Sequence, residues 1–219
     1  MKECESNILT EQFLNLKDQI FGKIDGDVVL EVKNPSALDG IKTLKSTVNF
    51  AIDNGKMPKL GSLEYLLRAG NILRSGLFGL SLNNLIQILA PYKTGEFEKI
   101  SGDISIKGGE VENINIYSQG KNLSMYLTGE YSIFDNFANV MIYGKLSQTI
   151  SNALGSVGNA SLSQVINSIT KDEKNKKQLQ ENFEKIPVLE NENQNPKYFK
   201  AKIIGDINKD NYINNFSWE

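Results

Sequence analysis

The sequence predicts an α+β fold: a long-stranded, strongly curved antiparallel β-sheet, shaped like a groove, with about three flanking amphipathic helices. Three observations support this prediction. Residues 96–146 contain successive runs in which apolar and polar side chains alternate, as in strands that bury one face. Short turn sequences separate these runs. Apolar residues at helical spacing flank this segment, in a chain of 219 residues that can bury a sizeable core.

The segment 96–146 is the clearest part of the pattern. Its turns fall at 108–109, 120–121 and 135–136, so the segment predicts a four-stranded antiparallel meander. Strands of about ten residues would be roughly 33 Å long at about 3.3 Å per residue. Alternation places one set of apolar side chains on a common face: Ile100, Ile104, Ile106, Ile114, Ile116, Leu123, Met125, Leu127, Ala138, Val140 and Ile142.

The remaining segments extend this plan. Residues 20–55 hold two further alternating runs, which we expect to join the same sheet. Helical periodicity predicts helices near 62–74, 81–90 and 148–170. The charged, asparagine-rich stretch 171–197 is interpreted as a linker or a solvated helix, and we expect it to be mobile.

These segments divide the chain into four parts. Residues 1–19 form an N-terminal extension, and 20–170 form the β-groove region with its helices. The charged linker covers 171–197. Residues 198–219 provide C-terminal strands that return to the sheet.

A short pattern recurs within the predicted strands: an aliphatic residue, any residue, glycine and an acid. Its glycines are Gly26, Gly102, Gly129 and Gly205. Glycine inside a strand often marks a bend or the close approach of another group. Repeated along long strands, it would allow strong coiling of the sheet, although strand-rich sequences also produce such a pattern by chance.

The composition argues against an enzyme. The chain has no histidine and a single cysteine, Cys4, which removes the commonest general base and every cysteine-based zinc site. The stretch 206–210 resembles the start of a calcium loop, but Asn211 and Ser217 replace the required glycine and glutamate. No metal and no cofactor are therefore predicted.

Nucleic acid and direct membrane insertion are also not predicted. The net charge is −2, and the tyrosines and phenylalanines are scattered without a companion basic stripe. The N-terminus lacks a signal-peptide pattern, and the least charged window, 75–92, is interrupted by polar and small residues. We expect a cytoplasmic chain, or a piece of a longer protein whose other part carries the targeting signal.

The order of motifs in the alternating segment matches a known family. A phenylalanine-initiated strand bends at Gly102, a G-G-x-V-x-N turn follows at 108–113, and a G-x-x-L-x-M-x-L-x-G strand occupies 120–129. In this order, residues 97–146 resemble the C-terminal repeat of the AsmA-like family of bacterial envelope proteins. The resemblance covers most of residues 20–219.

This resemblance implies a function without catalysis. Members of the family are typically long, carry an N-terminal membrane helix, and form a curled sheet whose apolar groove conducts phospholipid between two membranes. This chain would be a C-terminal module on the periplasmic side of the inner membrane, reaching the membrane through a missing N-terminal part or through partner proteins. The implied groove lining is Ile104, Ile106, Ile114, Ile116, Leu123, Met125, Leu127, Val140 and Ile142.

Two alternatives compete with this hypothesis. The apolar face could instead pack beneath the predicted helices as a closed α+β core. The domain could also be a structural scaffold that assists outer-membrane assembly through protein contacts. Carbohydrate binding is weakly supported, because the single tryptophan, Trp218, lies at the terminus.

Overall fold

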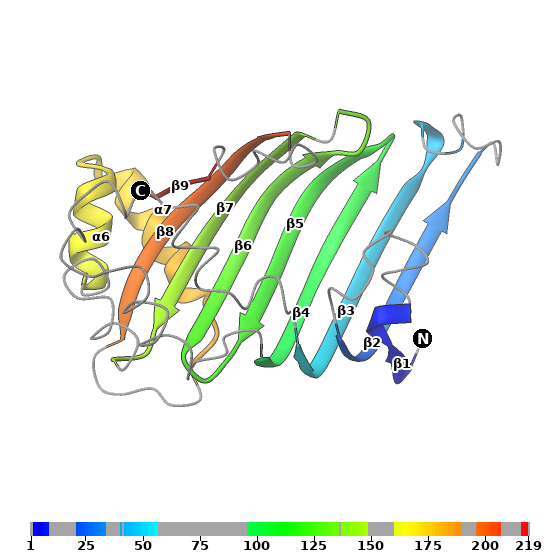
Figure 1. The fold of residues 1–219 in the computed structure, drawn as a ribbon. Coiled ribbons are helices and arrows are strands. Elements are labelled where there is room, and N and C mark those ends of the chain that lie inside the picture. The colour runs from blue at the N-terminus through cyan, green and yellow to red at the C-terminus, as the bar shows by residue number, and fades with distance from the viewer. Residues whose placement is uncertain are drawn as a thin grey trace.

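The computed structural model describes residues 2–8, 21–33, 40, 42–56, 96–135, 137–148, 160–189, 196–206 and 216–218. In this part of the chain a nine-stranded antiparallel sheet is formed, and every strand pairs with its neighbours in sequence (Figure 1). The strands are β1 (Cys4–Glu5), β2 (Phe21–Glu31), β3 (Lys45–Lys56), β4 (Glu96–Lys107), β5 (Glu110–Gln119), β6 (Leu123–Ser132), β7 (Phe137–Leu146), β8 (Lys197–Asp206) and β9 (Phe216–Trp218).

The predicted meander is confirmed. Strands β4 to β7 follow one another in the sheet, and each has 10 or 12 residues. The two runs in 20–55 form β2 and β3 of the same sheet, and the C-terminal segment returns to it as β8 and β9. Among the strands that the structure describes, β1 and β9 are not paired with each other, so the sheet is open.

The register gives the sheet two chemically different faces. Val48 of β3 lies between Val28 of β2 and Ile104 of β4, whereas the next residue, Asn49, lies beside Asp103. Successive side chains of a strand point to opposite faces. We call the face that carries Val48 the apolar face and the other one the polar face.

Two helices pack on the polar face. They are α6 (Leu162–Ile169) and α7 (Glu173–Glu184), and Figure 1 shows them at the β7–β8 end of the sheet. Their buried side chains form one cluster with Tyr126 of β6 and Tyr143 of β7. Both tyrosines alternate with apolar-face residues of their strands. The closed-core alternative therefore does not hold for α6 and α7, which cover the opposite face.

Residues 171–197, interpreted as a linker or a solvated helix, form the helix α7 over much of their length. Asp172 caps α7, and Leu179 and Phe183 of that helix are buried in the core. These two residues are four positions apart, so a narrow apolar stripe anchors a helix whose other positions are almost all polar. Leu189, beyond the helix, is also buried.

The three predicted helices have different outcomes. The segments 62–74 and 81–90 lie outside the described residues. Within 148–170 the structure describes residue 148 and residues 160–170, and α6 lies in the second of these parts.

The N-terminus of α6 gives a first stability prediction. Ser161 accepts a hydrogen bond from the Gln164 backbone, and the Gln164 side chain accepts one from the Ser161 N–H at 2.8 Å. Ser161→Ala removes the first of these bonds, and we expect a loss of about 1 kcal/mol in unfolding free energy. Denaturant titration of this variant beside Asn167→Ala, on an exposed position of the same helix, measures the difference. Equal midpoints would contradict a role for the cap.

Candidate functional site

The apolar face carries three rows of side chains that cross the sheet from β2 to β8. Each row follows directly from the cross-strand register. The central row is Gly26, Phe50, Gly102, Ile116, Leu127, Ile142 and Ala201. The rows beside it are Val28, Val48, Ile104, Ile114, Gly129, Val140 and Ile203, and Ile24, Ile52, Ile100, Ser118, Met125, Gly144 and Phe199.

These rows form one uninterrupted apolar surface. They contain no charged side chain, and the hydroxyl of Ser118 is their single polar group. Seven strands spaced about 4.8 Å apart make the surface about 29 Å long across the strands. Rows two residues apart make it about 13 Å wide. The arrangement can offer hydrophobic contact over a long, narrow strip.

All nine residues predicted to line the groove lie on this face. Seven belong to the three rows, and Ile106 and Leu123 lie just outside them, beside Val111 and Leu146. Ile142 is buried, with 7% of its surface exposed, and the other eight are half-buried. Half-burial leaves these side chains able to contact a further molecule without local unfolding.

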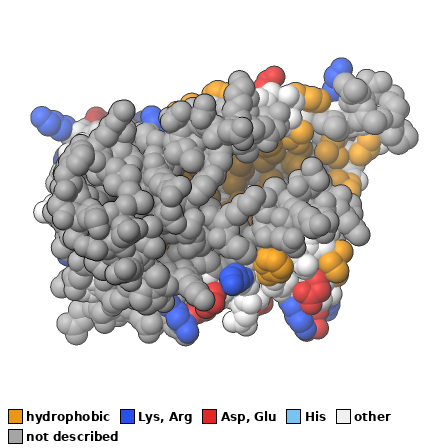
Figure 2. Space-filling view, viewed as in Figure 1, with side chains coloured by type: hydrophobic (Ala, Val, Ile, Leu, Met, Phe, Trp, Pro, Cys, Tyr) orange, Lys and Arg blue, Asp and Glu red, His pale blue; other side chains and the backbone are white. Residues whose placement is uncertain are grey.

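Figure 2 looks onto the apolar face and shows where its side chains gather. Where described residues are visible, hydrophobic side chains gather in the upper middle and right of the view, and charged side chains lie toward its edge. Charged residues stand at strand ends in the register, where Lys45 lies beside Lys107 and Lys56 lies beside Glu96. The three rows themselves carry no charge.

Sequence reasoning missed a row of aromatic rings on the polar face. Tyr117, Tyr126 and Tyr143 occupy adjacent strands, with ring centroids 5.1 and 6.0 Å apart. Phe183 of α7 meets Tyr143 edge-on at 5.2 Å and Tyr198 at 5.8 Å. The alternation signal was present, because each tyrosine occupies a polar-face position of its strand. The tyrosines are not scattered: they are the surface on which the helices dock.

Two cations accompany these rings. The ammonium group of Lys185 lies 5.1 Å from the Tyr126 ring centroid, and that of Lys145 lies 6.0 Å from Tyr198. Because Tyr126 is only 2% exposed, its ring is a core element and is not available to stack on a nucleic-acid base.

One tyrosine of the row has a shifted pKa. Burial, followed by the nearby Tyr126 and Asp103, raises the pKa of Tyr117 above its ordinary value of 10.0. The folded protein therefore favours the neutral phenol more than the unfolded chain does. This contribution to stability is complete below the unfolded pKa and is lost as the pH rises through the folded one.

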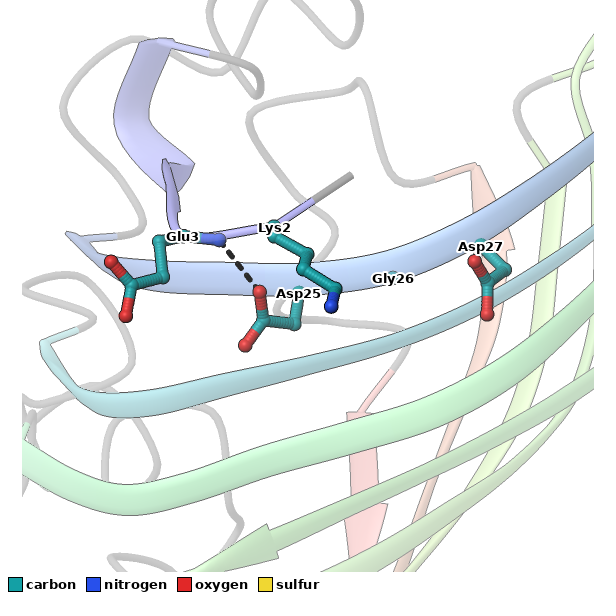
Figure 3. A pocket seen from close by; sticks show the side chains of 5 residues that line it. All are labelled: Lys2, Glu3, Asp25, Gly26 and Asp27. Atoms are coloured by element: carbon teal, nitrogen blue, oxygen red, sulfur yellow. Dashed lines mark hydrogen bonds between the residues drawn. The ribbon is translucent and has the colours of Figure 1, made fainter.

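A second concave region lies at the β1 edge of the sheet. Lys2, Glu3, Asp25, Gly26 and Asp27 line a pocket of about 610 Å³ (Figure 3). The Glu3 backbone N–H donates to the Asp25 carboxylate at 2.6 Å. Within the described part of the chain, no three histidine, cysteine or acidic side chains gather as a metal site. The two aspartates alternate with apolar-face residues, so their side chains belong to the polar face.

Comparisons with known proteins return nothing for this chain. No protein family, no curated protein and no solved structure matches it. In the part of the chain that the structure describes, no helix combines the length and hydrophobicity needed to cross a membrane.

Proposed function

We propose that the apolar face binds phospholipid acyl chains. In this proposal the chain is an AsmA-like envelope module that conducts lipid along a hydrophobic β-groove between membranes. The observation that carries the proposal is the set of three charge-free rows, which continue across β2 to β8 on the face opposite α6 and α7. Most side chains of these rows are half-buried, and a continuous apolar surface that is partly accessible can serve as an interaction site.

The dimensions and energies suit an acyl chain. One leaflet of a bilayer has a hydrocarbon depth of about 15 Å, half of the roughly 30 Å core. The apolar surface is about 29 Å long and can hold an extended chain across several strands. Each methylene that the face removes from water contributes about 0.8 kcal/mol. Contact with a few methylenes therefore offsets only part of the free energy needed to take a lipid out of a membrane. Such weak, repeated contact would let a lipid slide.

The lipid headgroup would remain at the hydrated border. The strands that carry the apolar rows end in charged residues, as at Lys45 of β3 and Lys107 of β4. A headgroup there keeps its water while the acyl chains follow the rows. No catalytic residue, metal or cofactor is required.

Strong curvature of the sheet around the apolar face belongs to the same proposal. At Gly26, Gly102 and Gly129 an added Cβ would collide with a backbone carbonyl oxygen of the neighbouring strand. These close approaches between strands support bending at the repeated glycines.

A structural, scaffolding role is the second candidate, and one observation favours it. The end of β2 exposes several large apolar side chains at the edge of the sheet. A strand edge of this kind pairs with another protein strand more readily than with lipid.

A charge placed on the apolar face tests lipid binding. Ile104→Glu and its sequence neighbour Ser105→Glu form a matched pair, because both positions are half-buried on β4 and point to opposite faces. We expect Ile104→Glu to fold and to lose co-purifying phospholipid, measured by native mass spectrometry. An acyl chain barred from about three methylenes of contact loses roughly 2.4 kcal/mol, about 50-fold in retention. Ser105→Glu should retain lipid.

Met125→Glu provides an independent check in the third row, where Met125 lies between Ser118 and Gly144. Circular dichroism establishes folding of each variant. Unfolding of both apolar-face variants would show that the face is a closed core, because a buried unpaired carboxylate costs several kcal/mol. Folded variants that keep their phospholipid would also defeat the proposal.

A further inference from the structure

Among the residues that the structure describes, the outer edge of β2 has no partner strand along most of its length. In the described part of the chain, β1 is the neighbour of β2 on that side, and it pairs with Lys23 and Ile24 alone. From Asp25 to Glu31 the structure describes no partner strand on this side. The backbone groups of β2 that face outward there are available to another strand.

The part of this edge from Val28 to Leu30 is apolar. Val28, Val29 and Leu30 are 48%, 68% and 64% exposed, and Val32 directly beyond the strand is 43% exposed. Soluble proteins usually protect such an edge with lysine, proline or a bulge. Between Asp25 and Val32 the sequence contains neither lysine nor proline.

We propose that this edge binds the same edge of a second copy of the chain, with β2 antiparallel to β2 about a two-fold axis at Leu30. Leu30 then faces Leu30 of the second copy, Val29 faces Glu31, Val28 faces Val32, and Asp27 faces Lys33. The last two pairs extend β2 by Val32 and Lys33, which directly follow it. The sequence is complementary to itself in this register, because the apolar pairs are flanked on both sides by opposite charges. The proposal does not depend on lipid binding.

Other registers fit less well. An axis at Val28 would place Asp25 opposite Glu31, and an axis at Val29 would place Asp27 opposite Glu31, so each would oppose like charges. A shift by a single residue would place the apolar face of one copy beside the polar face of the other. The axis at Leu30 avoids both costs and continues the apolar face from one copy into the next.

The first test is a disulfide across the axis. Residues directly opposite in an antiparallel pair have Cα atoms about 4.5–5.5 Å apart, within the range of a disulfide. Leu30→Cys in a Cys4→Ser background should therefore form a covalent dimer under mild oxidation, seen by non-reducing electrophoresis. Val188→Cys is the matched control, since Val188 is 58% exposed on a distant segment. We expect it to remain monomeric.

The second test exchanges charges. Asp27→Lys places two lysines opposite one another at both ends of the interface, and it should raise the dimer dissociation constant about tenfold or more. Lys33→Asp added to this variant restores opposite charges and should restore the dimer. Sedimentation equilibrium of the full chain over a range of concentrations measures each constant.

These measurements decide whether the chain forms a dimer through the edge of β2. A wild-type chain that is monomeric at all concentrations overturns the proposal, and so does equal cross-linking at Leu30 and Val188. A dimer unaffected by Asp27→Lys would place the interface elsewhere and also overturn it. A dimer weakened by Asp27→Lys and recovered by the double exchange supports this register.

Discussion

Phe183→Ala is expected to lower the free energy of unfolding by about 3–5 kcal/mol, the usual cost of removing a buried phenylalanine side chain. Phe183 is 2% exposed, and its ring meets both Tyr143 and Tyr198 edge-on. The substitution leaves a cavity between α7 and the polar face and removes the aromatic contacts as well. Denaturant titration followed by circular dichroism gives the change directly.

Glu181→Ala provides the control for this experiment, because Glu181 is exposed on the same helix. We expect it to change stability by less than about 0.5 kcal/mol. If Phe183→Ala were equally mild, α7 would not be part of the cooperative core and the linker interpretation would be restored. The folded fraction of Phe183→Ala should still retain phospholipid, because α7 lies on the face opposite the proposed site.

The strand alternation predicted both the sheet and its apolar face, for a local reason. A period of two residues determines which side chains share a face, so Ile104, Met125 and Val140 could be grouped without knowing the fold. Short turns then required neighbouring runs to pair antiparallel. The register observed in β4 to β7 follows from these two constraints except at the shifts between Ser105 and Ile106 and between Val111 and Ile114.

The face chosen by the helices could not be predicted in the same way. The sequence of an amphipathic helix indicates which side of the helix is buried, but it does not indicate which surface that side packs against. On the polar face the decisive residues are tyrosines, whose rings are apolar and whose hydroxyls are polar. Tyr126 illustrates this, since its ring is buried while its hydroxyl donates to the Asn115 side chain at 2.8 Å. Classifying each residue only as apolar or polar therefore missed the core on the polar face.

The composition of the stretch 171–197 left a linker and a solvated helix as alternatives, because composition averages over positions. Its many lysine, glutamate and asparagine residues indicate a solvated segment, whereas two residues, Leu179 and Phe183, decide that it docks. Helix anchoring depends on the spacing of a few large side chains more than on mean hydropathy.

The second prediction with a large expected effect on stability concerns Gly129, one of the glycines of the repeated pattern. Gly129 lies in the middle of β6 with φ at +152°, a conformation that side chains disfavour. An added Cβ would collide with the Asn139 carbonyl oxygen and lie 2.8 Å from the Val140 Cα atom. Both are backbone atoms of β7, so relief requires the two strands to separate.

Gly129→Ala is therefore expected to destabilise the fold by about 2–4 kcal/mol, which combines backbone strain of about 1–3 kcal/mol with the clash. Thr128→Ala, one residue away on the same strand, should cost much less, and thermal unfolding of the two variants compares them. If glycine serves only as a small residue on the apolar face, the two variants should have similar stability. If the glycine pattern instead allows the close approach of β6 and β7, Gly129→Ala should be far less stable than Thr128→Ala. Its remaining folded fraction should also bind phospholipid more weakly, because the strands that carry the rows are forced apart.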